Sequence, residues 1–171
     1  MEFVVLFIVN ILVFILQSSV VSHFEIMGIT ANLMLMFVIS TAIIKGPGKG
    51  LFCGIVMGLL QDFYFCEYVG CNFFIYALIA YIAGTSCKNL VKDNIFLPLI
   101  CSVASTLIYN VLFYVINVFL KGYIHGEVFL LKIVLPETVC NAIAILFVYF
   151  TLLPVYEFLD SRSKKYVNKV V

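Results

Sequence analysis

The chain has 171 residues and a formal net charge of +1, from ten basic and nine acidic side chains. Hydrophobic residues make up 64% of the chain and charged residues 11%, whereas soluble domains average about 45–50% and about 25%. A soluble fold of this length cannot bury so much apolar surface, so the composition excludes a soluble domain. The charges cluster between long apolar runs, which indicates a polytopic membrane protein with the lipid bilayer as its main solvent.

The sequence predicts an all-α bundle of six transmembrane helices, because six apolar runs approach or exceed the roughly 20 residues that a perpendicular helix needs. The predicted spans are Phe3 to Val21, Ile29 to Ile44, Gly50 to Cys66, Asn72 to Cys87, Ile95 to Leu120 and Val128 to Leu153. The second and third spans are short, which raises the alternative of one fused span. The residues from Lys45 to Lys49, with two glycines and a proline between them, argue for a turn and against fusion.

The first predicted span shares only its early apolar stretch with a signal peptide. It has neither a basic beginning nor an Ala-x-Ala cleavage site, and it continues into Gln17, Ser18 and Ser19. We expect this segment to be retained as a membrane helix, with Asn10 and Gln17 able to hydrogen-bond to other helices.

The third predicted span carries a glycine at every fourth position, Gly50, Gly54 and Gly58, and then Asp62. Four-residue spacing keeps these positions near one face of a helix, so another helix can approach the bare backbone there. We predict a helix-packing or partner-binding face at these four residues, with Gly58→Leu disrupting assembly by steric exclusion. An intramembrane carboxylate costs about 2.5–3.5 kcal/mol near the bilayer centre, so we expect Asp62 to be neutral or hydrogen-bonded.

A second polar group is predicted in the outer half of the sixth span, at Lys132, Glu137 and Asn141. Pro136 is expected to bend the helix and free a carbonyl, which would let these side chains form an inward cluster facing Asp62 or Gln61. The cluster either only holds the bundle together or forms a partner-docking or ligand site. The sequence leaves both alternatives open.

No residue pattern typical of catalysis, cofactor binding or metal binding is found in the sequence. His23 and His125 lie in predicted outer connections, without an acid or cysteine at a ligand or relay spacing. The cysteines contain no Cys-x-x-Cys pair, and most lie within or at the ends of apolar spans, where they are expected to pack as small apolar residues. Cys66 and Cys71 flank one connection and are an alternative disulfide pair if that compartment is oxidising.

Basic residues fall on one side of the predicted topology. Lys45 and Lys49 follow the second span, Lys88 and Lys92 follow the fourth, and the tail after the sixth contains four more. Short connections rich in lysine and arginine remain in the cytoplasm, so both termini are predicted to be cytoplasmic. We therefore divide the chain into a transmembrane domain, 1–153, and a basic juxtamembrane tail, 154–171, which either lies on an anionic membrane surface or only fixes the topology.

Three motifs in the first half of the chain are specific enough to compare with a protein family. They are Leu16-Gln17-Ser18-Ser19, Gly58-Leu59-Leu60-Gln61-Asp62 after the glycine-rich turn, and Tyr81-Ile82-Ala83-Gly84 before a basic connection. Together with the length and the span count, they resemble the MreD family of rod shape-determining proteins. The chain departs from the family at Ala31-Asn32, where the family commonly has Pro-Asp, so any role of that acid passes to Asn32 or is lost.

The resemblance implies a non-enzymatic scaffold or regulator of the bacterial cell-wall elongation complex, located in the cytoplasmic membrane. It implies a fold similar to the substrate-binding subunits of energy-coupling-factor transporters. It also implies an MreC-type bitopic partner, which connects the chain to MreB, RodA and a class B penicillin-binding protein. We expect no cofactor and no nucleic-acid partner.

Two alternatives from other functional classes remain open. One is the substrate-binding subunit of a small-molecule, vitamin-type transporter, which the implied fold kinship and the acids at Asp62 and Glu137 favour. The other is an ion-conducting protein. Span five carries Ser102, Ser105, Thr106 and Asn110 at near-helical spacing but no acid, so packing is favoured over conduction.

Overall fold

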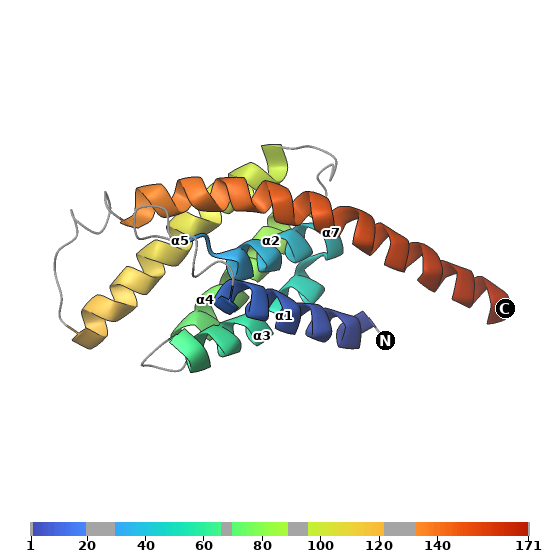
Figure 1. The fold of residues 1–171 in the computed structure, drawn as a ribbon, viewed down its shortest axis with the longest axis horizontal. Coiled ribbons are helices and arrows are strands. Elements are labelled where there is room, and N and C mark those ends of the chain that lie inside the picture. The colour runs from blue at the N-terminus through green and yellow to red at the C-terminus, as the bar shows by residue number, and fades with distance from the viewer. Residues whose placement is uncertain (1, 20–29, 66–69, 89–95, 122–132, 171) are drawn as a thin grey trace.

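The computed structural model describes residues 2–19, 30–65, 70–88, 96–121 and 133–170. These residues form six helices and no strand, which confirms the all-α prediction. The helices are α1 (Glu2–Ser19), α2 (Leu33–Lys45), α3 (Pro47–Phe65), α4 (Cys71–Ser86), α5 (Phe96–Lys121) and α7 (Leu135–Val170). They form a bundle from which the C-terminal part of α7 extends beyond the other helices (Figure 1).

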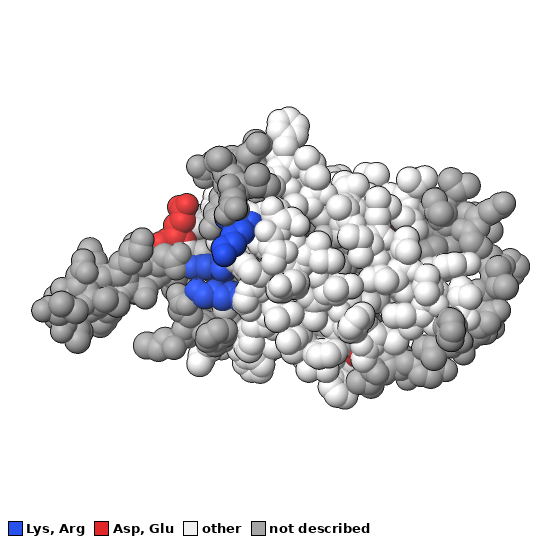
Figure 2. Space-filling model, turned by 180° about the vertical axis from the view of Figure 1, so that it is seen from behind, with Lys and Arg blue, Asp and Glu red and all other residues white. Residues whose placement is uncertain are grey.

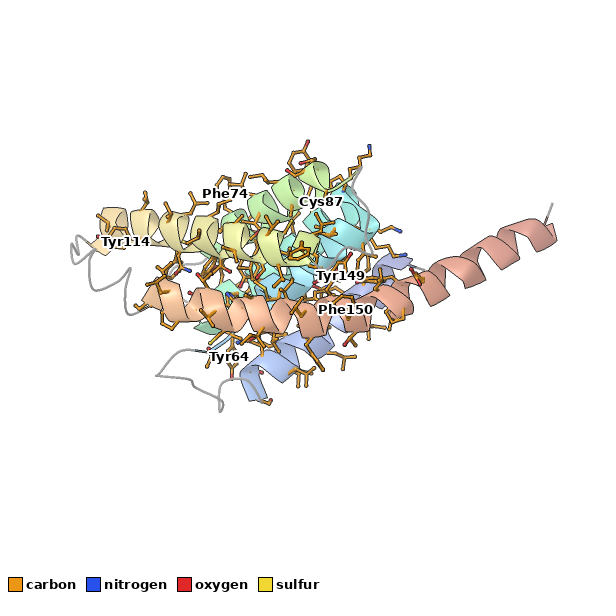
Figure 3. All side chains as sticks on the ribbon, turned by 90° about the horizontal axis from the view of Figure 1, so that it is seen from above. Tyr64, Phe74, Cys87, Tyr114, Tyr149 and Phe150 are labelled. Atoms are coloured by element: carbon orange, nitrogen blue, oxygen red, sulfur yellow. The ribbon has the colours of Figure 1, made fainter. Side chains whose placement is uncertain are left out.

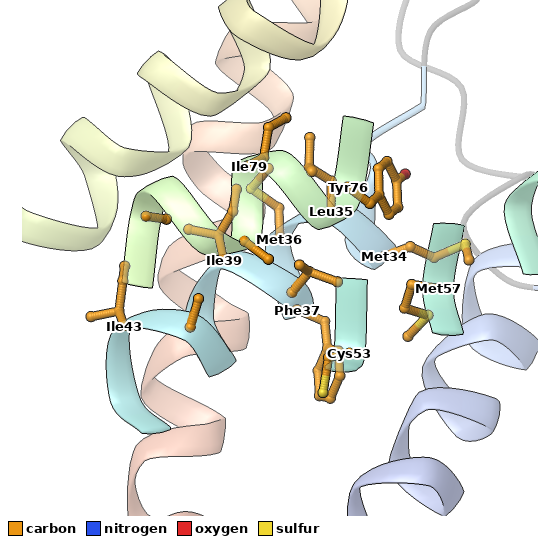
Figure 4. Close-up of a cluster of buried hydrophobic side chains, with 14 of the residues drawn as sticks. Met34, Leu35, Met36, Phe37, Ile39, Ile43, Cys53, Met57, Tyr76 and Ile79 are labelled. Carbon is orange, nitrogen blue, oxygen red and sulfur yellow. The ribbon is translucent and has the colours of Figure 1, made fainter. Parts of the chain in front are cut away.

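Helix α2 is the centre of the bundle, where it contacts each of the other five helices named above. It has 13 residues, and all of those from Met34 to Ile44 are buried. A helix that is hydrophobic on every side is stable only when it is enclosed, and here α3, α4 and α7 supply most of the enclosure. Figure 4 shows the resulting core, to which α2 contributes Leu35 and Phe37, α3 contributes Cys53, and α4 contributes Tyr76.

Helix α2 begins later and ends more abruptly than the sequence predicted. It starts at Leu33 rather than Ile29, because Asn32 caps its first turn. The predicted turn over residues 45–49 is reduced to one non-helical residue, Gly46, whose φ of +88° suits glycine. Pro47 then begins α3, a position where its missing N–H loses no hydrogen bond. The two helices are separate, so the fused alternative is wrong.

The glycine stripe of α3 packs against α4 of the same chain. A Cβ added to Gly54 would lie 2.7 Å from the carbonyl oxygen of Tyr76, and a Cβ added to Gly58 would lie 2.5 Å from the Cα of Phe73. Such distances are shorter than real Cβ contacts, so only glycine allows the two backbones to approach this closely. A partner helix could occupy this face only by displacing α4.

Two further close contacts fix the other end of α3. A Cβ added to Gly50 would lie 2.5 Å from the Cβ of Ala42 in α2, which the short α2–α3 connection brings alongside. A Cβ added to Gly84 of α4 would lie 2.5 Å from the Cα of Pro47. Close backbone contact therefore runs along the whole of α3, and Gly84 contributes to it from the opposite helix.

Within the described parts of the chain, two helices are long and apolar enough to cross a membrane, judged by length and composition. These segments are Phe96–Ile116 in α5 and Leu135–Glu157 in α7. The helical segments Val4–Ser19, Leu33–Lys45 and Cys71–Ser86 are apolar but shorter. The four remaining predicted spans therefore stay predictions.

The packing of α7 continues past the predicted start of the tail. Pro154 lies inside the helix, and Tyr156, two residues later, is only 3% exposed. The Tyr156 hydroxyl is 3.0 Å from Thr41 Oγ1. The backbone carbonyl of Tyr156 accepts a hydrogen bond of 3.4 Å from Lys45 Nζ. The Lys45 ammonium also lies 5.1 Å from the centre of the Tyr156 ring. The bundle therefore includes Tyr156.

We expect Gly58→Ala to lower the melting temperature of the purified protein in detergent. The added Cβ would meet the Phe73 backbone and force α3 and α4 apart, and overpacking of this kind costs roughly 1–3 kcal/mol. Gly48→Ala is the matched control, because a Cβ there meets nothing within 4 Å and alanine favours a helix over glycine by about 1 kcal/mol. Equal melting temperatures for the two variants would contradict the close α3–α4 contact.

Candidate functional site

A group of buried or partly buried polar side chains lies toward one end of the bundle. Five of the six described helices contribute members, and α2 is represented by Asn32, the residue that caps its start. This end carries the N-termini of α2, α4 and α7 and the C-termini of α1 and α3. We call the group the polar layer; its members are Gln17, Asn32, Asp62, Asn72, Tyr76, Thr106, Tyr109, Asn110, Glu137 and Asn141. Its hydrogen bonds join helices that are distant in sequence.

Asp62, in the last turn of α3, is fully buried and caps the start of α4. Its Oδ2 accepts hydrogen bonds from the N–H groups of Gly70 and Phe73, and its Oδ1 accepts one from the N–H of Asn72, each at 2.9 Å. Gly70, the N-cap residue of α4, has no side chain that could do this, so the carboxylate of α3 satisfies donors that a helix start leaves free. The expectation of a hydrogen-bonded Asp62 is confirmed.

The energetic cost of burying Asp62 is offset by these three contacts. Hydrogen bonds to a charged group contribute about 1.5–3 kcal/mol each, and the partial positive charge of a helix N-terminus adds a favourable interaction. The carboxyl oxygens of Asp62 are thus directed at the start of α4 in the same chain.

Asn72 and two tyrosines continue the polar layer from α4 to α5. The Tyr109 hydroxyl donates a hydrogen bond of 3.0 Å to Asn72 Oδ1. The Tyr109 ring packs at 60° to the Tyr76 ring, with centroids 5.8 Å apart. The sequence analysis missed these three residues, although tyrosines within apolar spans were a usable signal, because a buried hydroxyl needs a partner.

Asn32 joins α2 to both α4 and α7. Its Oδ1 accepts hydrogen bonds of 3.0 Å from the Leu35 N–H, as an N-cap residue does, and from the Tyr76 hydroxyl. Its own backbone N–H donates to Asn141 Oδ1 at 2.7 Å. Asn32, which occupies the position where the family commonly has the acid of Pro-Asp, is therefore a helix cap that contacts two other helices.

Gln17 ties the end of α1 to the same segment. Its Oε1 accepts a hydrogen bond of 2.8 Å from the Leu33 N–H, and its Nε2 donates to the Ala31 carbonyl at 3.2 Å. The predicted interhelical role of Gln17 is thus directed at the start of α2. Asn10, also predicted to reach another helix, contacts the sulfur of Cys53 in α3 at 3.4 Å.

Glu137 lies in the first turn of α7, is 8% exposed, and accepts a hydrogen bond of 2.9 Å from Asn110 Nδ2 of α5. Asn141, one turn later, donates to Thr106 Oγ1 at 3.1 Å. The polar residues of α5 noted in the sequence, Ser102, Ser105, Thr106 and Asn110, include no acid, and Glu137 of α7 supplies one next to them. The described contacts of Glu137 lead to α5 and to Asn141 of α7, whereas those of Asp62 lead to α4. That the cluster faces Asp62 or Gln61 stays a prediction.

Pro136 lies in the first turn of α7, between Leu135 and Glu137, and the two residues before Leu135, Ile133 and Val134, are π-helical. The predicted bend at Pro136 stays a prediction. Lys132, the third predicted member of this cluster, lies outside the described residues, as does Cys66 of the possible Cys66–Cys71 pair. The structure therefore joins Glu137 and Asn141 through their common neighbour α5.

The helical architecture and the glycine stripe can be set beside known protein families. A comparison with protein families matches residues 1–161 to the family described as rod shape-determining protein MreD. The chain belongs to the MreD family. Membership gives the chain a role in rod shape determination and places it among membrane proteins, in agreement with the two helices long enough to cross a bilayer. No curated protein and no solved structure matches the chain.

In this MreD chain, Asp62→Leu is expected to destabilise the fold more than Asp62→Asn. Leucine leaves the three α4 donors without a partner, at about 1–3 kcal/mol for each buried unsatisfied group, whereas the asparagine oxygen still accepts. Gln61→Leu is a neighbouring control, because the buried Oε1 of Gln61 has no hydrogen-bond partner among the described residues. Chemical denaturation in detergent measures all three. Equal losses for the two Asp62 variants would show that the negative charge itself is required.

The family difference at Asn32 leads to a second prediction. Asn32→Asp should leave stability nearly unchanged, because Asn and Asp cap helices equally well, whereas Asn32→Ala should cost about 1 kcal/mol from the lost cap alone. Asn32→Ala also removes the hydrogen-bond acceptor of the Tyr76 hydroxyl. The loss of stability in the double variant Asn32→Ala/Tyr76→Phe should therefore be smaller than the sum of the losses in the two single variants. Melting temperatures of the single and double variants test this, and full additivity would contradict the Asn32–Tyr76 hydrogen bond.

Proposed function

We propose that the chain is a non-enzymatic membrane scaffold that regulates the bacterial cell-wall elongation complex by binding an MreC-type bitopic partner. Family membership over residues 1–161 carries this proposal. The polar layer supports it, because Asp62 and Glu137 both hydrogen-bond to neighbouring helices of the chain. Acids used in this way stabilise the shape of the bundle, and a fixed shape is what a scaffold presents to its partners.

Helix α7 offers a suitable surface for the partner. Val139, Ile143 and Phe147 are spaced four residues apart along it and are 61%, 67% and 76% exposed. The helix is long enough to cross the membrane and extends beyond the rest of the bundle (Figure 1). We place the membrane helix of the MreC-type partner along this stripe, because the glycine face of α3 is already covered by α4. MreB, RodA and the class B penicillin-binding protein would be reached through that partner.

The distribution of charge supports a multi-pass orientation with both termini in the cytoplasm. Lys45, Lys49 and Lys88 come from the C-terminal end of α2, the start of α3 and the residues after α4, and the Lys and Arg side chains that Figure 2 colours lie close together. The polar layer lies toward the opposite end of α2. Membrane proteins keep lysine-rich connections in the cytoplasm, so in this orientation the polar layer lies toward the outer face.

The alternative function, a substrate-binding subunit of a vitamin-type transporter, would use the same polar layer. Glu137, Asn110 and Asn141 supply carboxylate and amide groups of the kind that orient a small polar ligand. In the scaffold proposal these groups only join α5 to α7. The two functions differ in the proteins that bind the chain.

The decisive test is a mild-detergent pull-down of the tagged full-length chain from its native membrane, followed by mass spectrometry. We expect an MreC-type bitopic protein together with cell-wall synthases. Ile143→Trp should reduce this recovery at least tenfold, equivalent to about 1.4 kcal/mol, because the indole disrupts the α7 stripe.

The matched control is Ile8→Trp on α1, where the side chain is 52% exposed and no partner is proposed, so recovery should be unchanged. Equal recovery with Ile143→Trp and wild type would place the partner on another face. Recovery of an ATPase and a coupling subunit in place of the MreC-type protein would favour the transporter function.

A further inference from the structure

Two cysteines from neighbouring helices lie in direct contact at the end of the bundle opposite the polar layer. Cys87 is the C-cap residue of α4 and is 2% exposed. Cys101 lies in the second turn of α5 and is partly buried. Their sulfur atoms are 3.2 Å apart. Figure 3 labels Cys87 where α4 ends.

The sulfur separation favours a covalent bond over a bridging metal ion. A disulfide has an S–S distance of about 2.05 Å, so the two sulfurs need to approach by only about 1 Å. A metal ion held in line between them, with metal–sulfur bonds of about 2.3 Å, would require a separation of about 4.6 Å. A structural zinc site needs four ligands, and the described residues contain no group of three or more histidine, cysteine or acidic side chains around a common point.

We propose that Cys87 and Cys101 form a modification site, a dithiol that a mild two-electron oxidant of the azo class closes into a disulfide between α4 and α5. Both S–H bonds break and one S–S bond forms. The two electrons and two protons pass to the N=N bond of the oxidant, which becomes a hydrazine. The cytoplasmic location proposed for this end is reducing, so the dithiol is the resting form and the disulfide forms under oxidative challenge.

The location of the pair gives the disulfide a mechanical effect. At the polar layer, α4 and α5 are already joined by the hydrogen bond between Tyr109 and Asn72. Cys101 precedes Tyr109 by about two helical turns, so the disulfide adds a second connection at the other end of the same helix pair. With both ends held, α5 can neither separate from α4 nor rotate against it, whereas the reduced protein keeps that freedom.

The test treats the full-length protein, purified under reducing conditions in detergent, with a small molar excess of diamide. Remaining thiols are then alkylated under denaturing conditions, and the protein is digested and analysed by mass spectrometry. We expect a cross-linked peptide pair containing Cys87 and Cys101, lighter by two hydrogen atoms than the separate peptides and absent after reduction. Oxidation should also raise the melting temperature of the wild-type protein.

Cys87→Ser and Cys101→Ser should each abolish the cross-link and the rise in melting temperature. Cys140→Ser, which removes a cysteine of α7 outside the pair, should retain both effects. The chain unfolded in detergent and urea before oxidation should give mixed pairings without preference for Cys87–Cys101. Failure of the folded protein to form this cross-link, or an equal yield from the unfolded chain, would overturn the proposal, and neither result bears on partner binding through α7.

Discussion

The enclosure of α2 is the constraint on which the rest of the structure depends. A helix of 13 residues spans about 20 Å, less than the hydrocarbon thickness of about 30 Å, and it is buried by protein along almost its whole length. Because the helix starts within the bundle, where Asn32 is buried, its first backbone donors need partners from other segments. Asn32 and Gln17 supply those partners, and Asn32 is held in turn by Asn141 of α7 and Tyr76 of α4.

The polar layer also contains the acids near the starts of α4 and α7, and these acids hydrogen-bond to other segments. The first turn of α4 is capped by Asp62 from α3, and the acid in the first turn of α7 accepts its hydrogen bond from Asn110 of α5. Burying a carboxylate is costly unless hydrogen bonds satisfy its lone pairs. Each acid therefore fixes the relative position of two helices, and the end of the bundle that contains the polar layer is specified by polar contacts that tolerate little displacement.

Apolar packing specifies the opposite half and the middle of the bundle. The glycines of α3 and Gly84 of α4 allow two backbones to touch, and this contact brings Cys53 and Met57 into the core around α2. A rigid interior of this kind leaves the outward faces of α5 and α7 free to interact with lipid or with another membrane helix. The proposed scaffold function would need that division, because partner binding is reproducible only when the binding surface does not change shape.

The sequence by itself determined the helical class, the close packing at Gly54 and Gly58, and the need for hydrogen bonds at Asp62, because hydropathy, four-residue spacing and the cost of a buried charge are local properties. The tertiary structure decided which partner each of these groups meets. Asp62 could have faced Glu137, but the end of α3 lies beside the start of α4, and Glu137 lies beside α5. Such pairings depend on how the helices are arranged in space, and no local pattern in the chain records that arrangement.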